Sequence, residues 1–125
     1  MWFWLIGRAI FGLYFIFNGV NHFTQFGHMK QYASHKRVPL AGPAVIVSGI
    51  IFLLGGLSIL TGYLLLWAVL LMAITLLVIT FCMHNFFTVA DAQAKQGEMV
   101  NFLKNWALIG ALLMMLGISD WSWNL

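Results

Sequence analysis

The chain has 125 residues, of which 62% are hydrophobic and only 7% are charged. A soluble domain carries roughly 25% charged residues, so this composition excludes a soluble domain and predicts an integral membrane protein. The net charge is +3, but no dense basic stripe is present, which argues against nucleic-acid binding. The expected partners are therefore the lipid bilayer, other membrane proteins and further copies of this chain.

Four apolar segments follow one another along the chain, each with the length of a membrane helix. They cover about residues 2–23, 43–60, 64–87 and 102–118. At 1.5 Å per residue, helices of about 17 to 24 residues span a hydrocarbon core of about 30 Å. The sequence predicts a single transmembrane domain over residues 1–125. Its fold class is all-α, an integral membrane four-helix bundle with antiparallel up-down topology.

The connections between these segments differ in length and polarity. Residues 24–42 and 88–101 are predicted as polar loops, whereas residues 61–63 form a short uncharged turn. The turn predicts that the second and third helices form a hairpin. Gly97 is expected to stop any helix in the second loop, which places Glu98 outside the helices.

The positive charges are distributed unequally between the two sides of the predicted bundle. Five of the six Lys and Arg residues lie on the side of the two long loops. The remaining one, Arg8, is expected to extend its side chain outward to the interface. Because Lys- and Arg-rich loops stay in the cytoplasm, the sequence predicts a plasma (inner) membrane protein with both termini extracytoplasmic.

Polar residues interrupt the first apolar segment near its end. Asn18, Asn21 and His22 share one helix face, since they lie at i, i+3 and i+4. A polar stripe on a membrane helix normally faces protein or a water-filled cavity. Antiparallel threading brings His84 and Asn105 to the same depth. These five residues form the predicted cofactor-binding pocket.

Two neutral imidazoles on facing helices suit several kinds of chemistry. They could hold haem iron, relay protons or donate hydrogen bonds to a quinone carbonyl. Haem is the less favoured because both histidines lie near the interface, so the cofactor stays open with a quinone as a candidate. No metal site and no catalytic residue is predicted, and side chains of this kind often serve only to bond neighbouring helices. The single cysteine, Cys82, is expected to be a packing residue.

Several short motifs occur in a fixed order along the chain. They are Gly7-Arg8, residues 12–23 (GLYFIFNGVNHF), Val38-Pro39-Leu40, residues 55–62 (GGLSILTG), His84-Asn85-Phe86 and residues 105–111 (NWALIGA). Together they resemble the DoxX family of small four-helix membrane proteins. The resemblance implies a likeness in outline to the small subunit of a thiosulfate:quinone oxidoreductase. Some family members are associated with redox complexes and oxidative-stress responses, while most have no established activity.

The resemblance has one departure that bears on function. Relatives often carry a glutamate three residues before the paired glycines of the second helix, where this chain has Phe52. The sequence therefore predicts a DoxX-like accessory subunit of a quinone-linked redox system and leaves open whether it is an enzyme. The alternative, favoured by the missing carboxylate, is a non-catalytic membrane scaffold or small-solute carrier.

Overall fold

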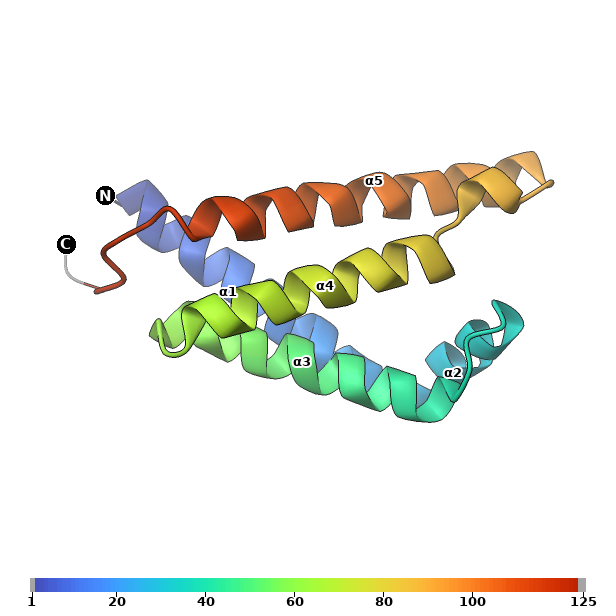
Figure 1. Ribbon diagram of the computed structural model, residues 1–125, viewed down its shortest axis with the longest axis horizontal. Coiled ribbons are helices and arrows are strands. Elements are labelled where there is room, and N and C mark those ends of the chain that lie inside the picture. Colours follow the sequence, from blue (N-terminus) through green and yellow to red (C-terminus); the bar gives the residue numbers. More distant parts are fainter. Residues whose placement is uncertain (1, 124–125) are drawn as a thin grey trace.

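The protein is described by a computed structural model over residues 2–123, and every regular element in this range is a helix (Figure 1). The helices are α1 (Trp2–Thr24), α2 (Phe26–His35), α3 (Ala41–Thr61), α4 (Leu65–Met83) and α5 (Ala92–Met115), with a short 3-10 helix η1 (Phe86–Thr88) before α5. The predicted all-α fold class is confirmed.

The long helices form two antiparallel pairs. Helix α1 lies along α3, and α4 lies along α5, and the pairs diverge toward the end where α2 lies (Figure 1). The predicted hairpin turn joins the pairs: α3 ends at Thr61, Gly62 adopts a left-handed φ of 79°, and α4 begins at Leu65. Glycine takes this conformation without the steric penalty that other residues incur.

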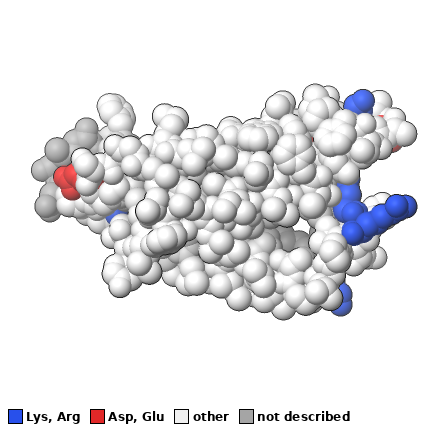
Figure 2. Space-filling model, in the orientation of Figure 1, with Lys and Arg blue, Asp and Glu red and all other residues white. Residues whose placement is uncertain are grey.

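Three segments are long and apolar enough to cross a membrane: Trp2–Thr24, Ala41–Thr61 and Leu65–Thr88. Helix α5 is not among them, because polar and charged residues recur through its first half, from Gln93 to Asn105. Figure 2 shows the corresponding surface: Lys and Arg gather at the end where α2 lies, and a wide uncharged band separates the two ends of the face shown. The protein is therefore an integral membrane protein with three candidate spans.

Glycines allow α1 and α3 to approach closely. A Cβ atom on Gly19 would lie 2.6 Å from the backbone nitrogen of Leu53, and one on Gly56 would lie 2.6 Å from the carbonyl oxygen of Gly12. Real Cβ atoms do not come this close to other atoms. The pair is therefore held by contact between backbones, which in lipid supplies dispersion energy that burial from water cannot.

Two segments predicted as loops are largely helical. Residues 24–42 contain α2, and α5 begins at Ala92 and continues through Gly97, so Gly97 does not stop the helix. Asp91 caps α5 by accepting a hydrogen bond from the backbone nitrogen of Ala94 at 2.8 Å. A cap contributes about 1 kcal/mol, which offsets the roughly 1 kcal/mol that an internal glycine costs a helix. Glu98 consequently lies within a helix, contrary to the prediction.

Arg8 points into the protein, so the expected outward extension is wrong. Its side chain is only 1% exposed. It donates to the carbonyl oxygens of Ile59 at 2.7 Å, Leu60 at 2.9 Å and Trp121 at 2.7 Å, and Trp123 lies over the guanidinium at 4.1 Å. The last carbonyls of a helix have no partner within it and carry partial negative charge, so they attract the cation. Arg8 thereby joins α1 to the end of α3 and to the C-terminal segment.

Candidate functional site

A cavity of about 730 Å³ lies between the two helix pairs. Figure 2 shows a hollow between the pairs, close to the charged end of the molecule. Small-molecule sites have volumes of about 300–1,000 Å³ and mainly apolar walls with a few polar groups. The cavity has this character, with apolar side chains supplied by α3 and α4: Val47, Ile51, Phe52, Ile74, Val78 and Ile79.

The structure brings most of the predicted pocket residues together. Asn18, His22, His84 and Asn105 all line the cavity. Asn21 is not among the lining residues; its side-chain oxygen lies 3.4 Å from the Thr24 hydroxyl, which donates to it. The shared face of α1 is therefore only partly turned toward the cavity, and the role of the other four residues remains a prediction.

His22 is held in a defined orientation. Its Nδ1 lies 2.7 Å from the backbone carbonyl oxygen of Asn18, one turn earlier in α1. A carbonyl oxygen only accepts, so Nδ1 must carry the hydrogen, and in the neutral ring Nε2 is then an acceptor. The ring also lies against Phe52 in a T-shaped arrangement, with centroids 5.5 Å apart. His22 therefore offers the cavity an acceptor rather than the donor expected from the sequence.

Phe52 occupies a central place beside His22. It is 1% exposed, lines the cavity and stacks on Phe15 with ring centroids 5.7 Å apart. An aromatic side chain at this position extends the apolar wall up to the imidazole. No acidic group is supplied from this point of α3, as the sequence indicated.

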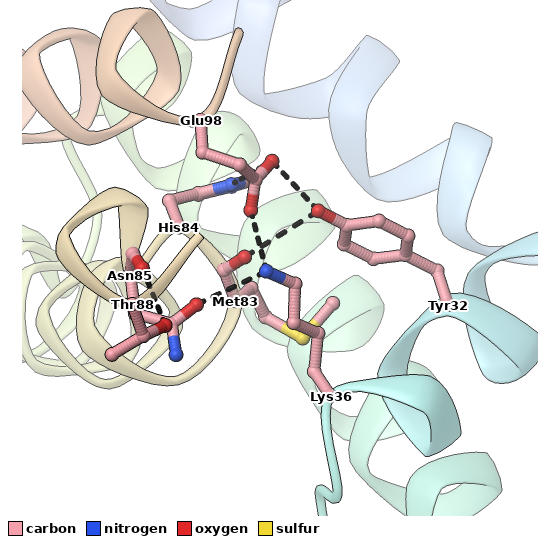
Figure 3. Close-up of polar contacts among 7 residues, drawn as sticks. All are labelled: Tyr32, Lys36, Met83, His84, Asn85, Thr88 and Glu98. Atoms are coloured by element: carbon pink, nitrogen blue, oxygen red, sulfur yellow. Dashed lines mark hydrogen bonds and ion pairs between the residues drawn. The ribbon is translucent and has the colours of Figure 1, made fainter. Parts of the chain in front are cut away.

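An acidic group instead reaches the cavity from α5. We define the Glu98 cluster as Tyr32, Lys36, His84 and Glu98, shown with their neighbours in Figure 3. The Tyr32 hydroxyl donates to Glu98 Oε1 at 2.7 Å, and Lys36 Nζ lies 2.9 Å from Glu98 Oε2. His84 Nδ1 lies 3.5 Å from Glu98 Oε1. Glu98, which the sequence places outside the helices, therefore reaches the cavity from within α5.

The charge state of the cluster follows from its contacts. Partial burial alone would raise the pKa of Glu98, but the hydrogen bonds from Tyr32 and Lys36 and the charge of Lys36 outweigh it and lower that pKa. Burial, followed by the hydrogen bond to Glu98 and its charge, raises the pKa of Tyr32. Because the fold lowers the pKa of Glu98, its ionised carboxylate stabilises the fold fully at pH values above the pKa of a free glutamate. This stabilisation is lost as the pH falls through the lowered pKa of Glu98 in the folded protein. Near neutral pH the cluster therefore holds an ionised Glu98 and a protonated Tyr32.

Sequence reasoning missed Tyr32 and Glu98 because both segments were interpreted as loops. Two signals pointed to them: Tyr32 and Lys36 lie at i and i+4, and Asp91 is a suitable N-cap for a helix containing Glu98. Cys82, expected to be a packing residue, is exposed and lines the cavity. Across residues 2–123, no three His, Cys, Asp or Glu side chains are grouped so that they could hold a metal ion.

Comparison with known proteins places the first four helices in a family. The DoxX family model matches residues 3–85, which is 83 of the 125 residues and includes His22 and His84. Glu98 and Asn105 lie on α5, beyond the matched segment. No curated protein and no solved structure matches the chain. Because the family model covers well over half of the sequence, the chain belongs to the DoxX family.

Proposed function

We propose that this DoxX-family protein binds a quinone-type ligand between its two helix pairs, as an accessory membrane subunit of a quinone-linked redox system. The cavity of about 730 Å³ is the observation that carries the proposal, because it combines apolar walls with imidazole and amide groups at one end. A quinone has the matching form, an apolar isoprenoid chain and a ring with two polar oxygens. A bound quinone would supply the two-electron chemistry, and the chain would bind and orient it.

The polar groups of the cavity suit both oxidation states of such a ring. His22 Nε2, left as an acceptor by the Asn18 bond, would accept from the hydroxyl of a quinol. The side-chain amides of Asn18 and Asn105 provide N–H donors for a quinone carbonyl, and both residues line the cavity. Phe52 presents an aromatic surface beside His22, which favours a planar ring.

Removing the imidazoles is expected to weaken ligand binding. One hydrogen bond contributes about 1 kcal/mol, so His22→Ala and His84→Ala should each raise the Kd for a short-chain ubiquinone about fivefold. Equilibrium dialysis of the protein in lipid nanodiscs, with empty nanodiscs as the blank, measures this Kd. His35→Ala is the matched control, because His35 is exposed on α2 and does not line the cavity. Unchanged Kd values in both cavity variants would refute a quinone site and favour a scaffold or a carrier of other small solutes.

We further propose that α5 crosses the membrane from about residue 102 and completes an antiparallel four-helix bundle. The proposal is supported by the antiparallel packing of α5 along α4 and by both ends of the described chain lying at the same end of the molecule (Figure 1). The Lys and Arg count then places both termini outside the cytoplasm. A reporter fused after residue 125 should read as extracytoplasmic, and one fused after Arg37 should read as cytoplasmic. A cytoplasmic reading at the C-terminus would mean that α5 does not cross or that the orientation is reversed.

A further inference from the structure

We propose that α2 is a lid over the polar end of the cavity, held closed by Glu98 of α5 through Tyr32 and Lys36. The inference deepens the proposed function, because the lid would control entry to the same site. It concerns the movement of a helix, however, and its test requires no quinone.

Helix α2 supplies part of the cavity lining. His28, Met29, Tyr32 and Ala33 all face this space, so displacing α2 would open its polar end. Figure 3 shows Tyr32 and Lys36 reaching from α2 across to the segments that follow α4 and to α5. Helix α2 therefore lines the cavity with one face and is bonded through Tyr32 and Lys36 to the opposite helix pair, which is the geometry of a lid.

The attachments of α2 on its two sides differ in polarity, although Met83 of α4 also packs against the apolar cluster between α2 and α3. Toward α3 it packs apolar side chains, with Ala33 buried against Ala41 and Val45. Toward α4 and α5 its hydrogen bonds and ion pair come from Tyr32 and Lys36, and the shorter contact of each is with Glu98. Two of these four polar contacts, and the two shortest, therefore end on a single carboxylate, while the apolar contact leaves α2 joined to α3 if they are lost.

The connection after α2 is suited to movement. Arg37 and Leu40, in the five residues between α2 and α3, have φ values of 63° and 51°. This left-handed region has a higher conformational free energy for residues other than glycine. A shift of α2 would let these two residues return to ordinary negative φ values. On the other side, Gln25 alone separates α1 from α2. Both ends of α2 thus have short segments at which its direction can change.

The Glu98 contacts are only partly shielded from water. The side chains of Lys36 and Glu98 are 14% and 13% exposed. The other charged or titratable groups near the carboxylate are Tyr32, His84 and Lys104. Replacing Glu98 by glutamine keeps the shape but removes the charge that Lys36 pairs with. The lid should then open more often without loss of the apolar contact to α3.

Asn105→Cys in a Cys82→Ser background provides the readout, because Asn105 lines the cavity and is only 4% exposed, whereas Cys82 is already exposed before α2 moves. The rate at which the introduced cysteine reacts with a charged, membrane-impermeant methanethiosulfonate reports access of water to the cavity. In nanodiscs, Glu98→Gln is expected to raise this rate on the order of tenfold, the effect of losing one charged hydrogen bond. Asp120→Asn is the matched control, since it makes the same acid-to-amide change on an exposed residue that follows α5.

Two reagents of opposite charge separate opening from electrostatics. Opening of the lid accelerates both an anionic and a cationic reagent, whereas a change of local charge alone accelerates the anionic one and slows the cationic one. The second pattern, or unchanged rates, would overturn the proposal. The exchanged pair Lys36→Glu with Glu98→Lys should restore rates close to those of the Asn105→Cys, Cys82→Ser protein without further changes.

A milder variant keeps the test valid if Glu98→Gln does not fold. Tyr32→Phe removes only the hydroxyl that donates to Glu98, and it should accelerate both reagents about threefold, because a neutral donor contributes less. No acceleration in a folded Tyr32→Phe protein would contradict the lid. Because the assay contains no quinone, it can contradict the lid while the dialysis experiment still shows quinone binding. It can equally support the lid while dialysis shows no quinone binding.

Discussion

Arg8→Leu is expected to lower the free energy of unfolding by about 3 kcal/mol, because it leaves several buried carbonyl groups without a donor. The guanidinium donates to Ile59, Leu60 and Trp121 and is almost fully buried. Leucine fills part of the space but can donate to none of them. The measurement is the unfolding of purified protein in detergent, followed by circular dichroism as denaturant is added.

Two further variants define the origin of this effect. Arg37→Leu makes the same substitution at an exposed arginine. It should change the unfolding free energy by less than about 0.5 kcal/mol, as is usual for surface positions. Arg8→Lys keeps the charge but not the planar set of donors, so its loss of unfolding free energy should lie between those of Arg8→Leu and Arg37→Leu. The C-terminal segment should also become more sensitive to protease in Arg8→Leu. Equal stability of the Arg8 and Arg37 variants would show that the buried contacts do not stabilise the fold.

Gly19→Ala is expected to destabilise the protein by about 3 kcal/mol through overpacking between α1 and α3. The added Cβ would lie 2.6 Å from the Leu53 nitrogen and 2.8 Å from the Gly49 carbonyl oxygen. Both are backbone atoms, so no side-chain rotation can relieve the contact and the helices must separate. The same denaturation measurement detects the loss.

Gly110→Ala is the matched control for Gly19→Ala. Gly110 also lies within a helix, but a Cβ there would meet no atom within 4 Å. Alanine favours a helix over glycine by up to about 1 kcal/mol, so this variant should be slightly more stable than the original protein. A loss of unfolding free energy in Gly19→Ala together with a gain in Gly110→Ala would show that the effect arises in the α1–α3 contact. A loss in both variants would contradict that explanation.

The general plan of the molecule could be predicted from local patterns. Apolar run lengths give the membrane helices, Thr61-Gly62-Tyr63 gives the hairpin turn, and the polar face containing Asn18 and His22 indicates a cavity. These features depend on residues close together in the sequence, or on the antiparallel order of neighbouring helices. For that reason His22 and His84 could be placed at one depth, and both line the cavity.

The features that were missed depend on contacts between distant residues. Arg8 was expected at the interface because a lone cation in an apolar segment normally extends to water, and nothing near it in sequence reveals carbonyls more than fifty residues away. Glu98 was placed in a loop because Gly97 precedes it, and the compensating partners come from α2. The direction of the His22 hydrogen bond likewise required the position of the Asn18 carbonyl.

Photolabelling with an azidoquinone tests most directly whether the cavity is a quinone site. The protein in nanodiscs is irradiated with the probe, digested and sequenced by mass spectrometry, with and without excess short-chain ubiquinone. We predict labelling of cavity residues such as Ile51 and Ile79 that the competitor suppresses, while the outward face of α1, including Ile10 and Phe17, is labelled weakly and without competition. Labelling spread evenly over the exposed apolar faces, unchanged by the competitor, would contradict the proposed function.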